Sequence, residues 1–171
     1  MAPILQMAPI LEPRRPAHRN GRSERGVALV EFALVSTLLF GLLFGILDFG
    51  NAYSRTLDVR HGAREGARLA AVNYTAGTTT VGAAQRALII GETCRRMDGG
   101  KGATVQVSFE SPTSGDPQGA VGQAARIVIA RPMTSLTGFY GPLLDGKTIR
   151  SEVRIRIEVK ASWTAGSGTC A

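Results

Sequence analysis

The sequence predicts an α+β protein in which a long N-terminal transmembrane helix extends into a small head with a short helix and an antiparallel sheet of three or more strands. Three observations predict this fold class. An apolar run of membrane-spanning length lies near the N-terminus, a helical stripe of small residues follows it, and alternating strand patterns fill the second half. With 171 residues, the chain has room for one ordinary domain plus an appendage.

The apolar run is VALVEFALVSTLLFGLLFGIL, residues 27–47, and Glu31 is its one charged residue. At about 1.5 Å per residue, a run of this length crosses a hydrocarbon core of about 30 Å. A cleavable secretory signal has a shorter apolar region, of about 7–15 residues. We therefore predict a transmembrane helix over residues 27–47.

Positive charge gathers on the N-terminal side of this run. The net charge of the chain is +7, and residues 1–26 contain five arginines against two acids. By the positive-inside rule, we expect the N-terminus to stay cytoplasmic and the chain from about residue 50 onward to be exported. Nucleic-acid binding is not predicted, because no cluster of Lys and Arg is interleaved with aromatic residues.

The helical pattern continues beyond the apolar run as an amphipathic extension. Small or apolar residues recur every three or four positions and form one stripe, which consists of Ala52, Thr56, Val59, Ala63, Ala67 and Ala70. Arg60, Arg64 and Arg68 form a separate basic ridge. Two interpretations are open: the ridge binds an anionic partner, such as lipid headgroups or acidic subunits, or it is a solvated face partly neutralised by Asp58 and Glu65.

The head begins with a helical pattern and then changes to strand patterns. A short helix is expected from about Thr80 to Met97, with Thr80 as its N-cap. Apolar residues alternate in ATVQVSF (103–109), ARIVIAR (125–131) and TIRSEVRIRIEVK (148–160), which predicts three strands. The last strand has one apolar face and one charged face, and the charged face is either solvated or binds something acidic.

Two cysteines, Cys94 and Cys170, lie in the part of the chain that we expect to be exported. Because there is no CxxC motif and no nearby histidine, a metal site is not predicted, and a disulfide is the simplest pairing. Two unpaired thiols are the alternative. A disulfide would hold the C-terminal segment TAGSGTCA, which we otherwise expect to be a loose tail.

No motif predicts an enzyme. The sequence lacks HExxH, GxSxG and P-loop motifs, and its two histidines, His18 and His61, lie in the basic N-terminal segment and on the membrane-proximal helix. We therefore predict no catalytic residue, no metal site, no cofactor and no small-molecule substrate.

The N-terminal half carries a resemblance to a known family. A basic leader that ends in Gly26, followed by Val27 and an apolar helix with Glu31 and Phe32 at its fifth and sixth positions, resembles a class III prepilin. The segments GVALVEFALV, GILDFGNAY and HGAREGARLAA together resemble the TadE-like pseudopilins of tight-adherence (Flp) pilus systems. In the head, GFYGPLLDGK and RSEVRIRIEV are similar to the C-terminal region of that family, with less specific motifs.

The resemblance implies a structural or assembly component of a tight-adherence (Flp, type IVb-like) pilus or secretion apparatus. It implies cleavage by a prepilin peptidase between Gly26 and Val27, and partners among other pilins or pseudopilins, inner-membrane platform proteins and membrane lipid. The implied location is the inner membrane, with a single pass and an extracytoplasmic head, or a surface pilus. The alternative is a membrane-anchored extracytoplasmic binding module unrelated to pili. The implied organisation is a leader at 1–26, a transmembrane helix at 27–47, an amphipathic extension at 48–72 and a head at 73–171.

Glu31 needs a partner or an interfacial position, because an unpaired carboxylate in hydrocarbon costs several kcal/mol. Cleavage after Gly26 would create an α-amino group on Val27, about one helical turn from Glu31, and this amine could pair with Glu31 of its own chain or of a neighbouring subunit. A Glu31 side chain that only snorkels to the interface is the alternative. Gly41 and Gly45 form a GxxxG segment that would admit a second helix, although glycine is common in membrane helices.

Overall fold

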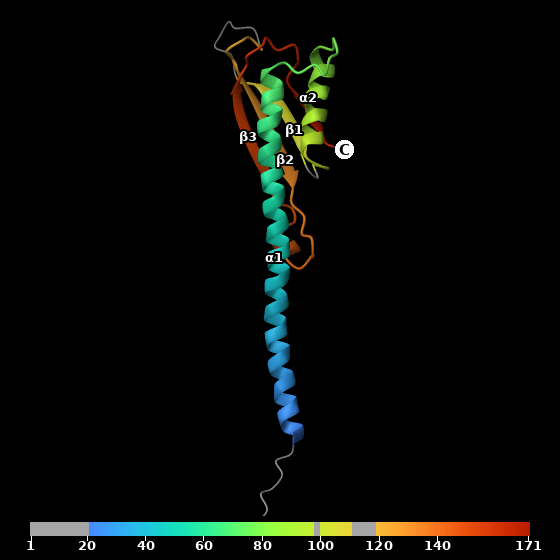
Figure 1. Cartoon of the computed structure of the whole chain (residues 1–171), viewed down its shortest axis with the longest axis vertical. Coiled ribbons are helices and arrows are strands. Elements are labelled where there is room, and N and C mark those ends of the chain that lie inside the picture. The colour runs from blue at the N-terminus through green and yellow to red at the C-terminus, as the bar shows by residue number, and fades with distance from the viewer. Residues whose placement is uncertain (1–20, 98–99, 111–118) are drawn as a thin grey trace, which may run out of the picture. The chain divides into compact units, whose positions relative to one another are not determined.

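The computed structural model describes residues 21–97, 100–110 and 119–171, with side chains from Gly26 onward (Figure 1). The predicted leader, residues 1–26, therefore lies mostly outside the described residues. The chain divides into two compact units, Met1–Phe40 and Gly41–Ala171.

Helix α1 runs over Gly21–Ala71 without interruption, as the apolar run and the following stripe predicted. In the first unit, side chains from Gly26 to Phe40 are exposed, apart from a half-buried Ser36. By length and composition, α1 is long and apolar enough to cross a membrane, and it is the one such helix in the described part of the chain. The structure thus fits a single-pass membrane protein.

The second unit adds helix α2 (Gly82–Arg96), the single turn α3 (Gly141–Leu144) and a four-stranded sheet. The strands are β1 (Thr104–Phe109), β2 (Ala124–Pro132), β3 (Thr148–Arg156) and β4 (Gly166–Thr169). They are all antiparallel, in the order β3-β2-β1-β4. Residues 133–147 connect β2 to β3, and we call them the β2–β3 loop. The α+β fold class is confirmed.

One face of the sheet packs against both helices. The buried core contains side chains from α1, α2 and three strands, including Val59, Ala63, Ala67, Ile89, Val105, Val107, Ile127, Ile129 and Ile149. The four α1 residues Val59, Ala63, Ala67 and Ala70 of the predicted stripe are fully buried. Three of these four residues are alanines. Their small side chains let the sheet and α2 lie close to α1.

Two glycines of the HGAREGAR segment make room for α2. A Cβ atom on Gly62 would lie 2.3 Å from Cγ of Met97, and one on Gly66 would lie 2.9 Å from Oγ1 of Thr93. Real Cβ atoms do not approach other atoms so closely, so a larger residue at either position would force the side chain of Met97 or Thr93 to move. Glu65, on the turn between these glycines, pairs with Arg96 near the end of α2.

The start of α2 differs from the prediction. Val81, and not Thr80, is the N-cap residue, and its side chain makes no capping hydrogen bond. Thr80 instead lies within hydrogen-bond distance of the Thr78 hydroxyl, at 2.8 Å. The backbone N–H of Gly82 donates to the carbonyl of Ser162 at 2.6 Å, so the segment between β3 and β4 supplies an acceptor for one of the N–H groups that have no partner within the helix.

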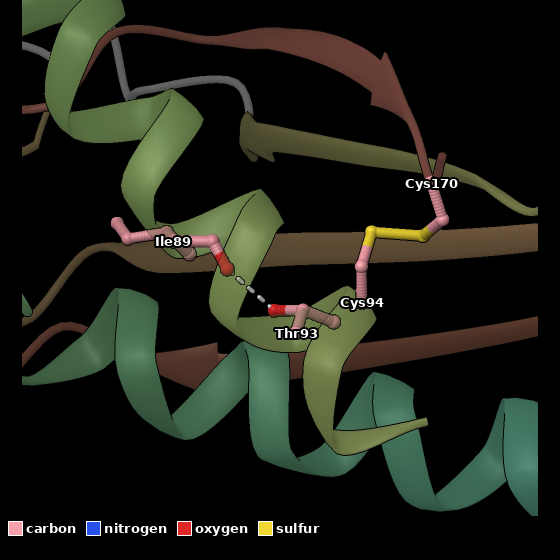
Figure 2. Close-up of a disulfide and its surroundings, with 4 residues drawn as sticks. All are labelled: Ile89, Thr93, Cys94 and Cys170. Atoms are coloured by element: carbon pink, nitrogen blue, oxygen red, sulfur yellow. Dashed lines mark hydrogen bonds between the residues drawn. A yellow bond between two sulfur atoms is a disulfide. The ribbon is translucent and has the colours of Figure 1, made fainter. Parts of the chain in front are cut away.

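The C-terminal segment, which we expected to be loose unless a disulfide held it, contains a strand that the sequence did not predict. Its residues 166–169 form β4, which pairs with β1 from Thr104↔Thr169 to Val107↔Gly166. The disulfide between Cys94 and Cys170 is present, and it ties the residue after β4 to α2 (Figure 2). The N–H of Cys170 also donates to the carbonyl of Ala103 at 2.8 Å. The third predicted strand, by contrast, ends at Arg156 and does not reach residue 160.

The outer face of the sheet carries paired charges of both signs. Arg126 on β2 donates two hydrogen bonds, of 2.7 and 2.6 Å, to Glu152 on β3. These bonds lower the pKa of Glu152 to about 2, so the pair stays ionised at neutral pH. Arg154 contacts both Glu152 and Glu110. This mutual neutralisation supports a solvated face over a binding face for an acidic ligand.

Removing the disulfide is expected to destabilise the head. The bond joins residues 76 positions apart, and the chain-entropy model then gives a loss of about 4–5 kcal/mol in the free energy of unfolding. Urea unfolding of Cys170→Ala in detergent should measure this loss. Cys94→Ala should lose the same amount, and the double variant no more, because all three lack the same bond. Recovery of both native cysteines as alkylatable thiols without reductant would contradict the prediction.

Candidate functional site

The residues predicted for processing and subunit pairing lie on the exposed first part of α1. Val27 is 56% exposed and Phe32 is 70% exposed, and Glu31 is exposed as well. A Cβ atom built on Gly26 would have nothing within 4 Å. Among the described residues, Glu31 has no hydrogen bond or ion pair assigned to it, so this surface is open to a partner outside the chain.

A second site, which the sequence analysis missed, is centred on Asp48. This residue directly follows the apolar run, yet its side chain is only 1% exposed. Its Oδ1 accepts hydrogen bonds from the N–H groups of Leu136 and Thr137, each at 2.8 Å. Its Oδ2 accepts from the hydroxyls of Ser135 and Thr137 at 2.7 and 2.8 Å, and from the N–H of Tyr140 at 3.4 Å. This many donors favour the charged carboxylate.

Aromatic rings hold the same β2–β3 loop against α1. The ring of Tyr140 lies 5.6 Å from that of Phe49, and the ring of Phe139 lies 5.7 Å from that of Phe44. The Tyr140 hydroxyl donates to the carbonyl of Gly41 at 3.0 Å. These contacts and the Asp48 bonds attach the loop to α1 over two helical turns.

Of the two glycines of the GxxxG segment, Gly45 lies closely against this loop. A Cβ atom on Gly45 would lie 3.4 Å from the Tyr140 ring, whereas one on Gly41 would lie in open space. Gly41, Phe44 and Gly45 are half-buried and Asp48 is buried, at the spacing of one helix face. The packing of a second helix on Gly41 and Gly45 stays a prediction, and such a helix would have to share this face with Tyr140.

The basic ridge is exposed at Arg60, Arg64 and Arg68. Asp58 and Glu65, the two acids that could neutralise this ridge, contact arginines outside it. Asp58 lies 3.9 Å from Arg131 of β2, and Glu65 pairs with Arg96. The interpretation of a ridge neutralised by its own helix is therefore not supported.

A metal-binding cluster or a pocket in the part of the chain that the structure describes, residues 26–97, 100–110 and 119–171, would be a further candidate site. That part of the chain contains no group of three or more His, Cys, Asp or Glu residues placed to hold a metal ion. A groove of about 460 Å³ lies between α2 and β4, next to the disulfide. Arg86 at its edge already donates to the carbonyl of Ala165 at 2.7 Å, so this cation is engaged within the chain.

Comparison with known proteins identifies the N-terminal segment. Residues 26–68 match the family model described as TadE-like protein. No curated protein and no solved structure matches the chain. The matched segment contains Gly26, Glu31, Asp48 and most of the buried stripe of α1, and it ends before the head.

Proposed function

Because residues 26–68 carry a TadE-like domain, which supports a component associated with a Tad pilus, we propose that the chain is a pseudopilin. Its role is that of a structural or assembly component of a tight-adherence (Flp, type IVb-like) pilus or secretion apparatus. The observation that carries this proposal is the family match itself, over a helix whose apolar run contains one exposed carboxylate, Glu31. No observation favours the alternative of a binding module unrelated to pili.

The proposal includes an orientation and a set of partners. The N-terminus is cytoplasmic and the head extracytoplasmic, on the side where the disulfide can form. Other pilins or pseudopilins, inner-membrane platform proteins and membrane lipid contact the exposed α1. The role is not catalytic, and neither a cofactor nor a small-molecule substrate is part of it.

Maturation by a prepilin peptidase is the processing step that we propose. Gly26 and Val27 both lie within α1, so the peptide bond between them must leave the helical conformation before a protease can cleave it. Glycine lowers the cost of that opening, because it is about 1 kcal/mol less favourable than alanine inside a helix. A small residue at position 26 also leaves space for the protease.

Intact-mass analysis of the native protein should therefore find a species that begins at Val27. Gly26→Phe should leave the full-length precursor. Gly50→Phe is the matched control, because a Cβ atom at Gly50 also meets nothing within 4 Å on the same helix, and this variant should be cleaved normally. A mature form that begins near Ser54 would indicate an ordinary signal peptidase and would contradict the proposal.

A further inference from the structure

The β2–β3 loop exposes apolar side chains next to the end of the apolar run. Leu136, Phe139 and Leu143 are 64%, 59% and 56% exposed. Figure 1 shows the loop, in orange, against α1 beyond the end of β2. Its aromatic contacts with α1 reach from Gly41 to Phe49, so they include the last two turns of the predicted transmembrane segment. A water-soluble loop would not place three large apolar side chains in this position.

We propose that the tip of this loop, residues 136–143, inserts into the membrane that α1 crosses. It lies at the boundary between phospholipid headgroups and acyl chains, in the leaflet that faces the head. This inference goes beyond the pilus role and rests on the membrane span of α1. The head is then attached to the bilayer at two places, by α1 and by the loop.

Apolar side chains are also exposed on α1, at the level of its contacts with the loop. The α1 residues beside the loop contacts expose their side chains, namely Leu42 (59%), Leu43 (45%), Ile46 (63%) and Leu47 (44%). Charged residues mark the other end of the loop, where it joins the sheet: Lys147 is exposed, and Arg55 donates to the Thr134 hydroxyl at 2.6 Å. This change from an apolar tip to a charged base matches the change from acyl chains to headgroups.

The backbone N–H groups of the loop tip donate hydrogen bonds within the chain, as insertion requires. Asp48 accepts from Ser135, Leu136, Thr137 and Tyr140, and Asp145 accepts from the N–H of Ser135 at 2.7 Å. The N–H groups of Leu143 and Leu144 donate to the carbonyl of Tyr140, each at 3.0 Å. Because these N–H groups are paired within the chain, the tip can enter an apolar medium without exposing unpaired backbone donors.

Spin-label depth measurements on the full chain in phosphatidylcholine vesicles test the proposal. Both native cysteines are in the disulfide, so labels attach to Leu136→Cys, Leu143→Cys, Leu42→Cys and Val121→Cys without competing thiols. Val121 is a matched control, because it is 63% exposed and precedes β2, whereas the loop follows it. The nine residues of β2 therefore place Val121 about 30 Å from the start of the loop.

The labels at Leu136 and Leu143 should collide with dissolved oxygen and be shielded from a water-soluble nickel complex. Their depth should be about 5–10 Å below the headgroups. The label at Leu42 should lie at a similar depth, because Leu42 is five residues, or about 7.5 Å, inside the end of the apolar run. The label at Val121 should be in water. Adding Asp48→Ala to the Leu136→Cys chain should move the label into water, which would support the proposal further.

Three results would overturn the proposal, and they have different meanings. Nickel access at Leu136 equal to that at Val121, with Leu42 still in lipid, would reject loop insertion and leave the span and the pilus role intact. Shielding of Leu136 from both nickel and oxygen would mean that another protein, such as a second copy of the chain, covers the loop. A label in water at Leu42 would reject the membrane span, and with it the proposed function.

Discussion

Asp48→Ala is expected to release the β2–β3 loop from α1 while the sheet stays folded. The carboxylate accepts five hydrogen bonds from the loop, three of them from backbone N–H groups. Alanine provides no acceptor, so the loop exchanges these bonds for bonds to water and opens. In hydrogen-exchange mass spectrometry of the full chain in detergent, the amides of Leu136, Thr137 and Tyr140 should exchange roughly 100-fold faster, because charge-assisted bonds are lost.

Two further variants sharpen this prediction. Asp58→Ala is the matched control, because Asp58 is also an aspartate of α1 but contributes one partly exposed ion pair, at 3.9 Å from Arg131. It should leave the exchange of the loop unchanged. Asp48→Asn should give an intermediate rate of hydrogen exchange. One side-chain oxygen still accepts hydrogen bonds from the loop, but the new NH2 group faces loop N–H and O–H groups, which cannot accept from it. If the loop amides of Asp48→Ala exchange as slowly as those of the native chain, the aromatic contacts are sufficient to hold the loop against α1, and the prediction is wrong.

The sequence was sufficient for the parts of the fold that depend on a repeating pattern. The apolar run and the stripe through Val59 and Ala63 predicted α1, because burial on one face of a helix repeats every three or four residues. Alternation predicted β1, β2 and β3 for the equivalent reason. The segment GSGT of β4 carries no such pattern, since its pairing with β1 is made by backbone groups that every residue has.

The Asp48 site could not be found in this way, because its partners are distant in the chain. The hydrogen bonds join residues separated by 87 to 92 positions, and no periodicity relates them. A local signal does exist. A carboxylate directly after a membrane-length apolar run requires donors, and TSLTG is a segment rich in hydroxyl and backbone donors. Glu31, in contrast, was identified because its surroundings in the sequence are uniformly apolar.

Glu31→Leu is expected to abolish the assembly role while leaving insertion and cleavage intact. Leucine suits lipid better than glutamate does, and Glu31 has no partner assigned within the described chain, so the substitution removes nothing from the fold. What it removes is a charge one helical turn from the amine that cleavage would create on Val27. In a neighbouring subunit shifted along the axis, that amine would lie beside Glu31 and fix the stagger between subunits. We expect loss of pili in electron micrographs at normal levels of mature protein.

Control variants distinguish the effect of the charge at residue 31 from the effect of the shape of its side chain. Thr37→Leu makes the same kind of change in the same run, at a side chain that bonds the carbonyl of Ala33 in its own helix, and it should leave piliation normal. Glu31→Gln keeps the shape and removes the charge, so it should fail as Glu31→Leu does. Carbodiimide treatment of pili mixed from isotope-labelled and unlabelled chains should join the Val27 amine to Glu31 between chains. Normal piliation with Glu31→Gln would mean that the side chain snorkels to the interface without an ionic partner.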